Sequence, residues 1–309
     1  MIDAVCVECG SYLDRDETTC RACGADNTTA GGDDSVVELD DVVLDRLGEW
    51  SLVKHEIISK YASTYTTILS KQRFARRIVY IDGFAGAGVA IDGETGEYVP
   101  GSAVRALEIQ PEFDEYHFIE LDDRKRSLLR RLTENNPRVT VHRGDCHRVL
   151  VEDVLPRCLY EDYSRGLCLL DPYGLTVDYS LLQRIGAMKS VEIFFNFMVV
   201  SANRNVLWTD PARVSRSRWP LLTKAWGDES WRTDLYERQA DLLGGRERKI
   251  SNERVVEKYR DRLRMAGFKY VPKPIPMRNS HNATVYYLFF ASPNRTGAEI
   301  VDDIFRTYS

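Results

Sequence analysis

The sequence lacks any apolar run of the roughly 18 residues that a membrane-spanning helix needs. Its first residues, MIDAVCVECG, lack the basic segment followed by an apolar one that is typical of a secretory leader. No Gly-Lys-Ser/Thr end follows its glycine-rich loop, so a P-loop nucleotide site is not expected. We therefore expect a cytoplasmic protein, with a hydrophobic fraction of 43% and a charged fraction of 29% that suit a globular fold.

Charge is unevenly distributed along the 309 residues. Residues 1–49 contain 3 Lys/Arg and 13 Asp/Glu, whereas residues 204–281 contain 18 Lys/Arg and 10 Asp/Glu. A basic region on an acidic protein, of net charge −5, indicates a polyanionic partner such as DNA or RNA. The alternative is that these residues are the solvated faces of helices.

Four cysteines near the amino terminus have the spacing C-x2-C-x10-C-x2-C, and each pair is followed by glycine; they are Cys6, Cys9, Cys20 and Cys23. Two such pairs can present four thiolates to one tetrahedral ion, which predicts a structural zinc ribbon over residues 1–27. Two disulfides are the alternative. The polar, acidic segment 28–41 is predicted to be a linker. Three further cysteines lack ligand spacing and are expected to be ordinary thiols: Cys146, Cys158 and Cys168.

From residue 42 onwards, helical and strand-like segments alternate, which predicts an α/β fold with a mostly parallel sheet. The expected strands are 77–82, 115–120, 138–142, 166–171 and 191–197, with helices between them. Residues 198–266 read as consecutive helices, a helical insertion or a substrate-side subdomain. Two late strand-like segments would complete a seven-stranded Rossmann-like sheet with a carboxyl-terminal antiparallel hairpin. That is the architecture of class I S-adenosylmethionine (SAM) dependent methyltransferases, and we assign residues 42–309 to it.

The first predicted strand ends in the loop DGFAGAG, which supplies the candidate cofactor residues Asp82, Phe84, Gly86 and Gly88. Acidic residues also follow the next two strands, at Glu120 and Asp145, and ligands of open α/β sheets bind at such strand ends. Asp82 and the glycine amides are expected to hold the amino-acid end of SAM. Glu120 would accept hydrogen bonds from the ribose, and Asp145 from the adenine. Each carboxylate alone could instead be a helix N-cap, and the loop a tight turn.

The fourth predicted strand ends in DPYG, residues 171–174, which resembles the D-P-P-Y motif of amino-group methyltransferases. Asp171 and the Pro172 carbonyl are predicted to accept hydrogen bonds from an exocyclic amino group, and Tyr173 to stack on an extruded base. Asn196, at the end of the next strand, is predicted to line the same site. The second proline is missing, and a type I turn is the alternative. No Pro-Cys motif of the cytosine C5 type is present, so we expect no cysteine nucleophile.

Several collinear segments resemble the three-Cys-motif partner proteins (TcmP). They are KHEIISKY, IVYIDGFAGAG, PGSAVRALE, FIELDD, GDC, LLDPYG, FFNF, SANRN, YYLFFAS and NRTGAEIVDDIF. This resemblance implies a SAM-methyltransferase-like fold over about residues 50–309. It also implies association with a second protein that bears a three-cysteine, radical-SAM-like motif. The four-cysteine ribbon is an addition to the family's pattern.

Three functions are compatible with these motifs. The first is a SAM-dependent methyltransferase acting on a nucleic-acid base, with the amino group as the favoured acceptor. The second is a catalytically silent accessory subunit of the radical-SAM-like partner. The third is a nuclease that places Asp82, Asp145 and Asp171 around Mg²⁺. The five histidines show no metal spacing.

Overall fold

The computed structural model describes residues 4–5, 12–13, 42–239, 246–279 and 281–308. The four predicted zinc ligands and the whole predicted linker, residues 28–41, lie outside the described residues. The zinc ribbon and the linker therefore stay predictions. Two short strands in the first part of the chain, β1 (Ala4–Val5) and β2 (Tyr12–Leu13), pair with each other in antiparallel fashion.

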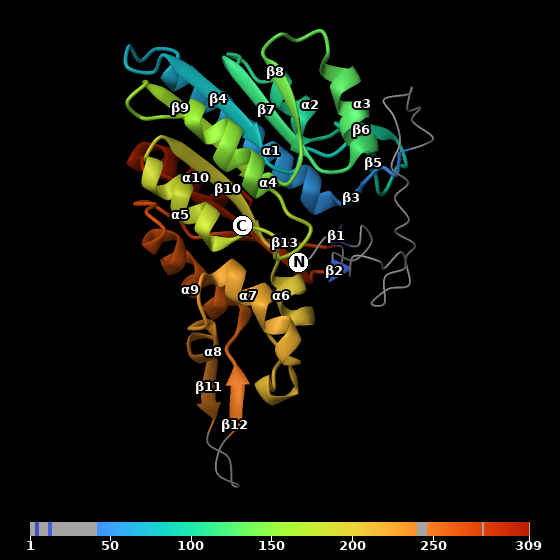
Figure 1. The fold of residues 1–309 in the computed structure, drawn as a ribbon, viewed down its shortest axis with the longest axis vertical. Coiled ribbons are helices and arrows are strands. Elements are labelled where there is room, and N and C mark those ends of the chain that lie inside the picture. The colour runs from blue at the N-terminus through green and yellow to red at the C-terminus, as the bar shows by residue number, and fades with distance from the viewer. Residues whose placement is uncertain (1–3, 6–11, 14–41, 240–245, 280, 309) are drawn as a thin grey trace.

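A seven-stranded sheet forms the centre of the fold (Figure 1), in the order β13-β14-β10-β9-β4-β7-β8. Its strands are β4 (Arg77–Asp82), β7 (Glu115–Glu120), β8 (Val139–Arg143), β9 (Ser164–Leu170), β10 (Val191–Phe197), β13 (Ile275–Arg278) and β14 (Thr284–Ala291). Five adjacent strands of the sheet are parallel to one another: β10, β9, β4, β7 and β8. The strand β14 runs antiparallel to both of its neighbours, β10 and β13. The seven-stranded, mostly parallel sheet with a late antiparallel pair is confirmed.

The parallel strands are buried on both faces, as their nearly unbroken apolar sequences require. One face packs against α1 (Glu49–Leu69), α2 (Ser102–Leu107), α3 (Asp123–Thr133) and α10 (Arg295–Thr307). The other face packs against α4 (Cys146–Val149) with the π-helical turn Leu150–Val154, and against α5 (Tyr179–Met188) and α9 (Asn252–Met265). Cys146, Cys158 and Cys168 are buried free thiols in this second core.

The region after β10 contains more than the predicted helices. It comprises α6 (Val199–Asn205), two 3-10 turns, α7 (Trp219–Trp226) and α8 (Trp231–Asp234), followed by an antiparallel pair, β11 (Tyr236–Gln239) with β12 (Arg246–Lys249). This pair extends away from the body of the molecule in Figure 1. The prediction that this region contains only helices is therefore wrong for β11 and β12, which are paired strands.

A three-stranded sheet covers the loop after β4. It consists of β3 (Arg46–Leu47), β5 (Val89–Asp92) and β6 (Tyr98–Pro100), and β3 runs parallel to β5. Val42 and Leu44 pack with Ala87 and Leu128, so the segment before α1 lies against the glycine-rich loop and α3. No helix in the described part of the chain is long and apolar enough to cross a membrane.

The helix α5 packs closely against the end of α9 at Gly186. A Cβ added at Gly186 would lie 2.3 Å from the carbonyl oxygen of Ala266, which is backbone and cannot move aside. We expect Gly186→Ala to lower the free energy of unfolding by about 2 kcal/mol, because overpacking outweighs the helix propensity gained. Urea denaturation measures this, with exposed Gln183→Ala on the same helix as the control. An unchanged midpoint for Gly186→Ala would show that the two helices can separate freely.

Candidate functional site

Four polar side chains lie at the carboxyl ends of four adjacent strands. Asn196 is on β10, Asp171 directly follows β9, Asp82 ends β4 and Glu120 ends β7. The chain leaves β4 toward β7 and β8 and then returns to β9 on the other side, so the strand order reverses between β4 and β9. Ligands of open α/β sheets bind at such a reversal, and Asp82 and Asp171 flank it.

Asp82 is fully buried and keeps one oxygen without a partner. Its Oδ1 accepts the backbone N–H of Phe84 at 3.1 Å, whereas its Oδ2 has no hydrogen-bond partner in the structure. Burial raises the pKa of Asp82 to about 6, whereas the nearby Ser102 side chain and the Phe84 N–H lower it. A buried oxygen left unpaired is costly, and it marks the place where a donor on a ligand would bind.

Asp171 is held from two sides. The Lys54 ammonium on α1 forms an ion pair with Asp171 Oδ2, and the Asn196 amide donates to Oδ1. Since the carboxylate requires a donor, this contact fixes the orientation of the amide and leaves Asn196 Oδ1 as a buried acceptor without a partner. Lys54 is only 4% exposed, so its charge is confined to the Asp171 and Asp82 side of the helix.

Glu120 shapes the glycine-rich loop. Its two oxygens accept the backbone N–H groups of Gly86 and Asp122, at 2.8 and 2.7 Å. Gly86 and Gly88 have φ values of +62° and +77°, a region that side chains rarely adopt. Burial raises the pKa of Glu120. Each oxygen retains a lone pair, so a ribose hydroxyl could be accepted in addition.

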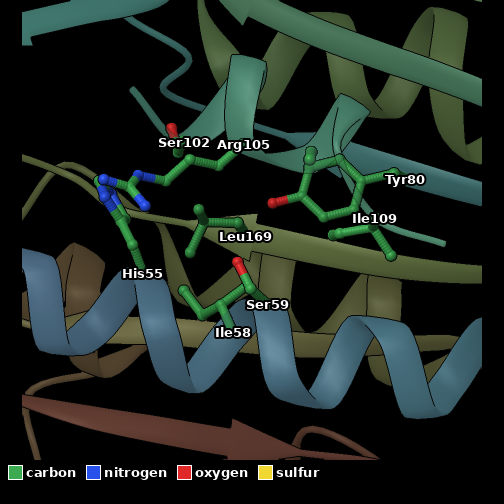
Figure 2. Close-up of a pocket in the computed structure, with 9 residues that line it drawn as sticks. His55, Ile58, Ser59, Tyr80, Ser102, Arg105, Ile109 and Leu169 are labelled. Carbon is green, nitrogen blue, oxygen red and sulfur yellow. The ribbon is translucent and has the colours of Figure 1, made fainter. Parts of the chain in front are cut away.

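A small pocket lies between α1, α2 and the sheet (Figure 2). The His55 ring and the Arg105 guanidinium stand together on one side, and the hydroxyl groups of Tyr80 and Ser59 point toward the space between the helices. His55 is 5% exposed, and its Nδ1 has no partner. Burial, with the nearby Lys54 and Arg105 charges, holds the pKa of His55 well below its usual range.

The other predicted residues have different surroundings. Phe84 packs partly buried against the second core, and Pro172 is buried. Tyr173 is exposed, and its hydroxyl accepts from Lys125 Nζ at 3.3 Å, an ammonium that also contacts Asp45 at 2.9 Å. Asp145 is exposed and caps α4 by accepting the Arg148 N–H at 3.0 Å. Asp145 is thus the N-cap of α4, and its predicted contact with the adenine stays a prediction.

Sequence reasoning missed Lys54 and Arg105. Lys54 precedes Ile57 and Ile58 by three and four residues, so it lies on the apolar face of its helix, where a lysine is unexpected. This position on the apolar face is the sequence feature that could have identified Lys54 as a site residue. For Arg105, on the short helix after the glycine-rich loop, the sequence offers no comparable mark.

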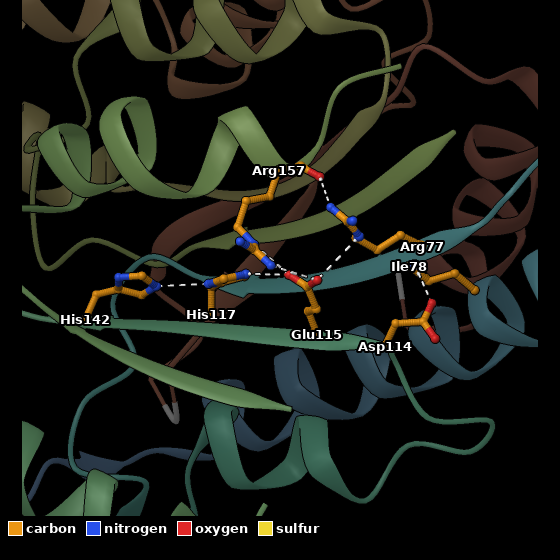
Figure 3. A network of polar contacts seen from close by, with 7 residues as sticks. All are labelled: Arg77, Ile78, Asp114, Glu115, His117, His142 and Arg157. Carbon is orange, nitrogen blue, oxygen red and sulfur yellow. Dashed lines mark hydrogen bonds and ion pairs between the residues drawn. The ribbon is translucent and has the colours of Figure 1, made fainter. Parts of the chain in front are cut away.

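A separate polar network lies on the α4 side of the sheet (Figure 3). Glu115 accepts from Arg157 at 2.8 Å and contacts His117 at 3.2 Å, and His117 contacts His142 at 2.9 Å. Burial lowers the pKa of His117 to about 4, so the ring is neutral at physiological pH. Across the described residues, no group of three or more His, Cys, Asp or Glu is placed to hold a metal ion. The three aspartates of the nuclease alternative thus do not form one cation site.

No family model and no curated protein matches the sequence. Solved structures match at low identity. Protein LPL1258 from Legionella pneumophila str. Philadelphia 1 is 12% identical, with a TM-score of 0.46 over 84% of this chain and 92% of that one. A putative methyltransferase from Thermobifida fusca YX is 10% identical, with a TM-score of 0.38 over 79% of this chain and 81% of that one.

The N-terminal domain of EvdMO1, solved with S-adenosylhomocysteine (SAH) bound, is 12% identical, with a TM-score of 0.38 over 77% of this chain and 81% of that one. Methyltransferases are thus among the similar structures, and the fold assignment itself rests on the strand order described above. Membership of the three-Cys-motif partner family stays a prediction.

The raised pKa of Asp82 has a consequence for stability. A carboxyl group with a pKa of about 6 in the folded state and 3.8 when unfolded costs stability above pH 6, and this cost disappears as the pH falls toward 4. We expect Asp82→Asn to raise the free energy of unfolding by roughly 2 to 3 kcal/mol at pH 8, and by much less at pH 4.5. Urea denaturation of both proteins across this range measures the difference. A difference that does not depend on pH would contradict the assignment.

Proposed function

We infer that the chain binds SAM at the carboxyl ends of β4, β7 and β9. The support is a pair of buried polar atoms without partners, Asp82 Oδ2 at the end of β4 and His55 Nδ1 in the small pocket. SAM carries an ammonium and a carboxylate on the same carbon. The ammonium would donate to Asp82 Oδ2, and the carboxylate would lie next to the Arg105 guanidinium, with His55 beside it. Both charges of the amino-acid end thus find complementary groups.

The remaining cofactor contacts follow from the loop. A Cβ at Gly86 would lie 3.6 Å from Asp45 Oδ2, an ordinary contact distance, so this side of the loop faces the Asp45 carboxylate. Glu120 holds this loop by the Gly86 N–H and can accept a ribose hydroxyl with its free lone pair. When bound, SAM supplies an electrophilic methyl group on a sulfonium centre.

We propose an amino nitrogen as the methyl acceptor. Asn196 Oδ1 is a buried acceptor without a partner, and it belongs to an amide whose other end is fixed by Asp171. An exocyclic amino group has two N–H donors, which Asn196 Oδ1 and an Asp171 lone pair would accept. Holding both hydrogens orients the nitrogen lone pair away from them and toward the methyl group. In this arrangement Lys54 is a positioning residue, since it orients the Asp171 carboxylate.

We propose a nucleic-acid base as the carrier of that amino group. The segment that follows Asn196 leads into the basic insertion, where the guanidinium groups of two exposed arginines lie near the Trp219 ring. The Arg232 guanidinium lies 4.0 Å from the Trp219 ring centroid, and that of Arg216 lies 5.6 Å from it. Guanidinium groups beside an indole suit phosphates and bases together. DNA or RNA, and the radical-SAM-like partner that the family resemblance implies, belong to this proposal.

A catalytically silent accessory subunit is the second candidate. One observation favours it: both Asp171 oxygens already have partners inside the protein, Lys54 and Asn196. A carboxylate satisfied in this way would serve the architecture alone. The fold and the cofactor contacts would be retained while no methyl group is transferred.

Calorimetric titration with SAH tests the cofactor proposal. We expect a dissociation constant on the order of micromolar, and a weakening of about tenfold to a hundredfold in Asp82→Asn, which loses a charge-assisted hydrogen bond. Binding to the unaltered protein should also weaken below pH 6, because Asp82 then takes up a proton. Asp153→Asn, at an exposed carboxylate, is the matched control. Absence of a binding signal, or equal binding by Asp82→Asn, would contradict the proposal.

Asp171→Ala separates the two candidate functions. For a methyltransferase we expect SAH to bind with nearly unchanged affinity, and transfer of a labelled methyl group to RNA or DNA to fall at least a hundredfold because the acceptor loses its orientation. For an accessory subunit, no transfer is seen with either protein. Lys54→Met, which frees Asp171 Oδ2, should lower transfer less than Asp171→Ala does. Full transfer by Asp171→Ala would refute the role given to this carboxylate.

A further inference from the structure

Two loops at the amino-terminal edge of the sheet bring aromatic rings and guanidinium groups together. Residues 70–76 precede β4 and residues 159–163 precede β9, and these strands are parallel neighbours. Both loops therefore lie at the edge opposite the candidate cofactor site, side by side in Figure 1. The Arg76 N–H donates to the Tyr163 carbonyl at 3.0 Å and joins them. We call this surface the basal patch; it consists of Lys71, Arg73, Phe74, Arg76, Leu159, Tyr160, Tyr163 and Arg165.

The basal patch leaves its large apolar side chains in solvent. Phe74, Leu159, Tyr160 and Tyr163 are 47%, 41%, 50% and 46% exposed. They make up four of the eleven large hydrophobic residues that are exposed in the described part of the chain, although the two loops contribute few residues. Exposed rings scattered singly need no explanation, whereas a cluster from two separate segments indicates a binding surface.

The rings are held in place by arginines. The Arg165 guanidinium lies 4.1 Å from the Tyr160 ring centroid and 5.6 Å from that of Phe74, and Arg76 lies 5.0 Å from that of Tyr163. Arg165 is further fixed by donating to the Ser164 carbonyl at 2.7 Å. These contacts order the surface before any partner binds, which reduces the entropy lost on association.

The positive charges of the basal patch have no carboxylate partner among the described residues. Lys71, Arg73 and Arg76 are exposed and form no ion pair there. Several exposed arginines elsewhere do pair along their own helix, as in Arg264 with Asp261, Arg295 with Glu299 and Arg306 with Asp302. Two carboxylates, Glu161 and Asp162, are exposed on the second loop, and the cations outnumber them. The surface thus has a surplus of positive charge beside open rings.

We propose that the basal patch binds single-stranded nucleic acid. Bases would stack on Tyr160, Tyr163 and Phe74, and Lys71, Arg73 and Arg76 would contact the phosphates. A duplex is disfavoured because its base faces are already stacked. The six residues of β4 separate this surface from the cofactor site by about 20 Å, so it holds a different part of a long strand from the part that reaches Asp171. Binding here needs neither SAM nor methyl transfer.

Two variants test the two halves of the interaction. The ring variant is Phe74→Ala with Tyr160→Ala, which keeps the lysine and arginines. The charge variant is Lys71→Gln with Arg73→Gln, which keeps the rings. Binding is measured by fluorescence anisotropy with a labelled single-stranded RNA of roughly 20 nucleotides, and with the same RNA as a duplex, over a range of salt concentrations without SAH.

We expect the ring variant to bind the single strand about tenfold more weakly, with an unchanged salt slope. The charge variant should bind more weakly at low salt, and the slope of log affinity against log salt should decrease by about 1.4, from two lost phosphate contacts. Neutralising the acidic pair with Glu161→Gln and Asp162→Asn should tighten binding. The duplex should bind more weakly than the single strand to the unaltered protein.

Two controls isolate the surface. Tyr98→Ala removes a 61% exposed ring on β6, and Arg130→Gln with Arg131→Gln removes two exposed charges on α3. Unchanged SAH binding shows that each variant is folded, so failure here is distinguishable from failure of the cofactor proposal. Equal affinity of the ring variant and the unaltered protein for single-stranded RNA would overturn the inference. The inference would also be overturned if the ring variant kept its affinity for RNA but no longer formed a complex with a protein partner. The surface would then bind a protein.

Discussion

A carboxylate that is enclosed by protein and has one unpaired oxygen is the constraint on which the site depends. Asp82 lies where the strand order reverses, and the fold gives it only the Phe84 N–H, the Ser102 hydroxyl and a share of the Lys54 charge. The resulting rise in its pKa measures how incomplete this environment is. A ligand with an ammonium group would complete it. We regard the unpaired oxygen of Asp82 as the strongest single indication of the ligand that this site binds.

The two ends of the site are linked through one lysine. Lys54 pairs with Asp171 and lowers the pKa of Asp82, so its ammonium lies under the influence of both carboxylates. It comes from α1, which precedes the sheet in the chain, whereas its two partners come from β4 and the end of β9. The proposed cofactor end and the proposed acceptor end are therefore electrostatically coupled. A substitution at Lys54 is expected to affect both.

The sequence predicts the sheet well because its strands are short, apolar and separated by helices of clear period. The bounds of β4, β7 and β10 agree with the expectations, and β13, which contains Pro276, lies at the edge of the sheet, where proline is tolerated. The β11 and β12 hairpin was missed because its strands, YERQ and RERK, carry charged residues on both faces and so show no apolar alternation.

The site was predicted only where motifs lie at strand ends. Asp82, Glu120, Asp171 and Asn196 follow from the rule that ligands bind there. The ion pair between Lys54 and Asp171 joins residues 117 positions apart, and no local pattern carries such a contact. Asp145 is a different case, because its contact is local. Its carboxylate accepts the N–H three residues later, at the start of a helix, and the strand-end rule does not distinguish such an N-cap from a ligand-binding carboxylate.

The central claim is that Asp82 is completed by the ammonium of a bound SAM molecule. A crystal structure of the protein grown with SAH measures this directly. The account predicts electron density between the glycine-rich loop and the small pocket, with the amino nitrogen within hydrogen-bonding distance of Asp82 Oδ2 and the carboxylate beside Arg105. Density elsewhere, or a bound SAH whose amino group faces away from Asp82, would contradict it.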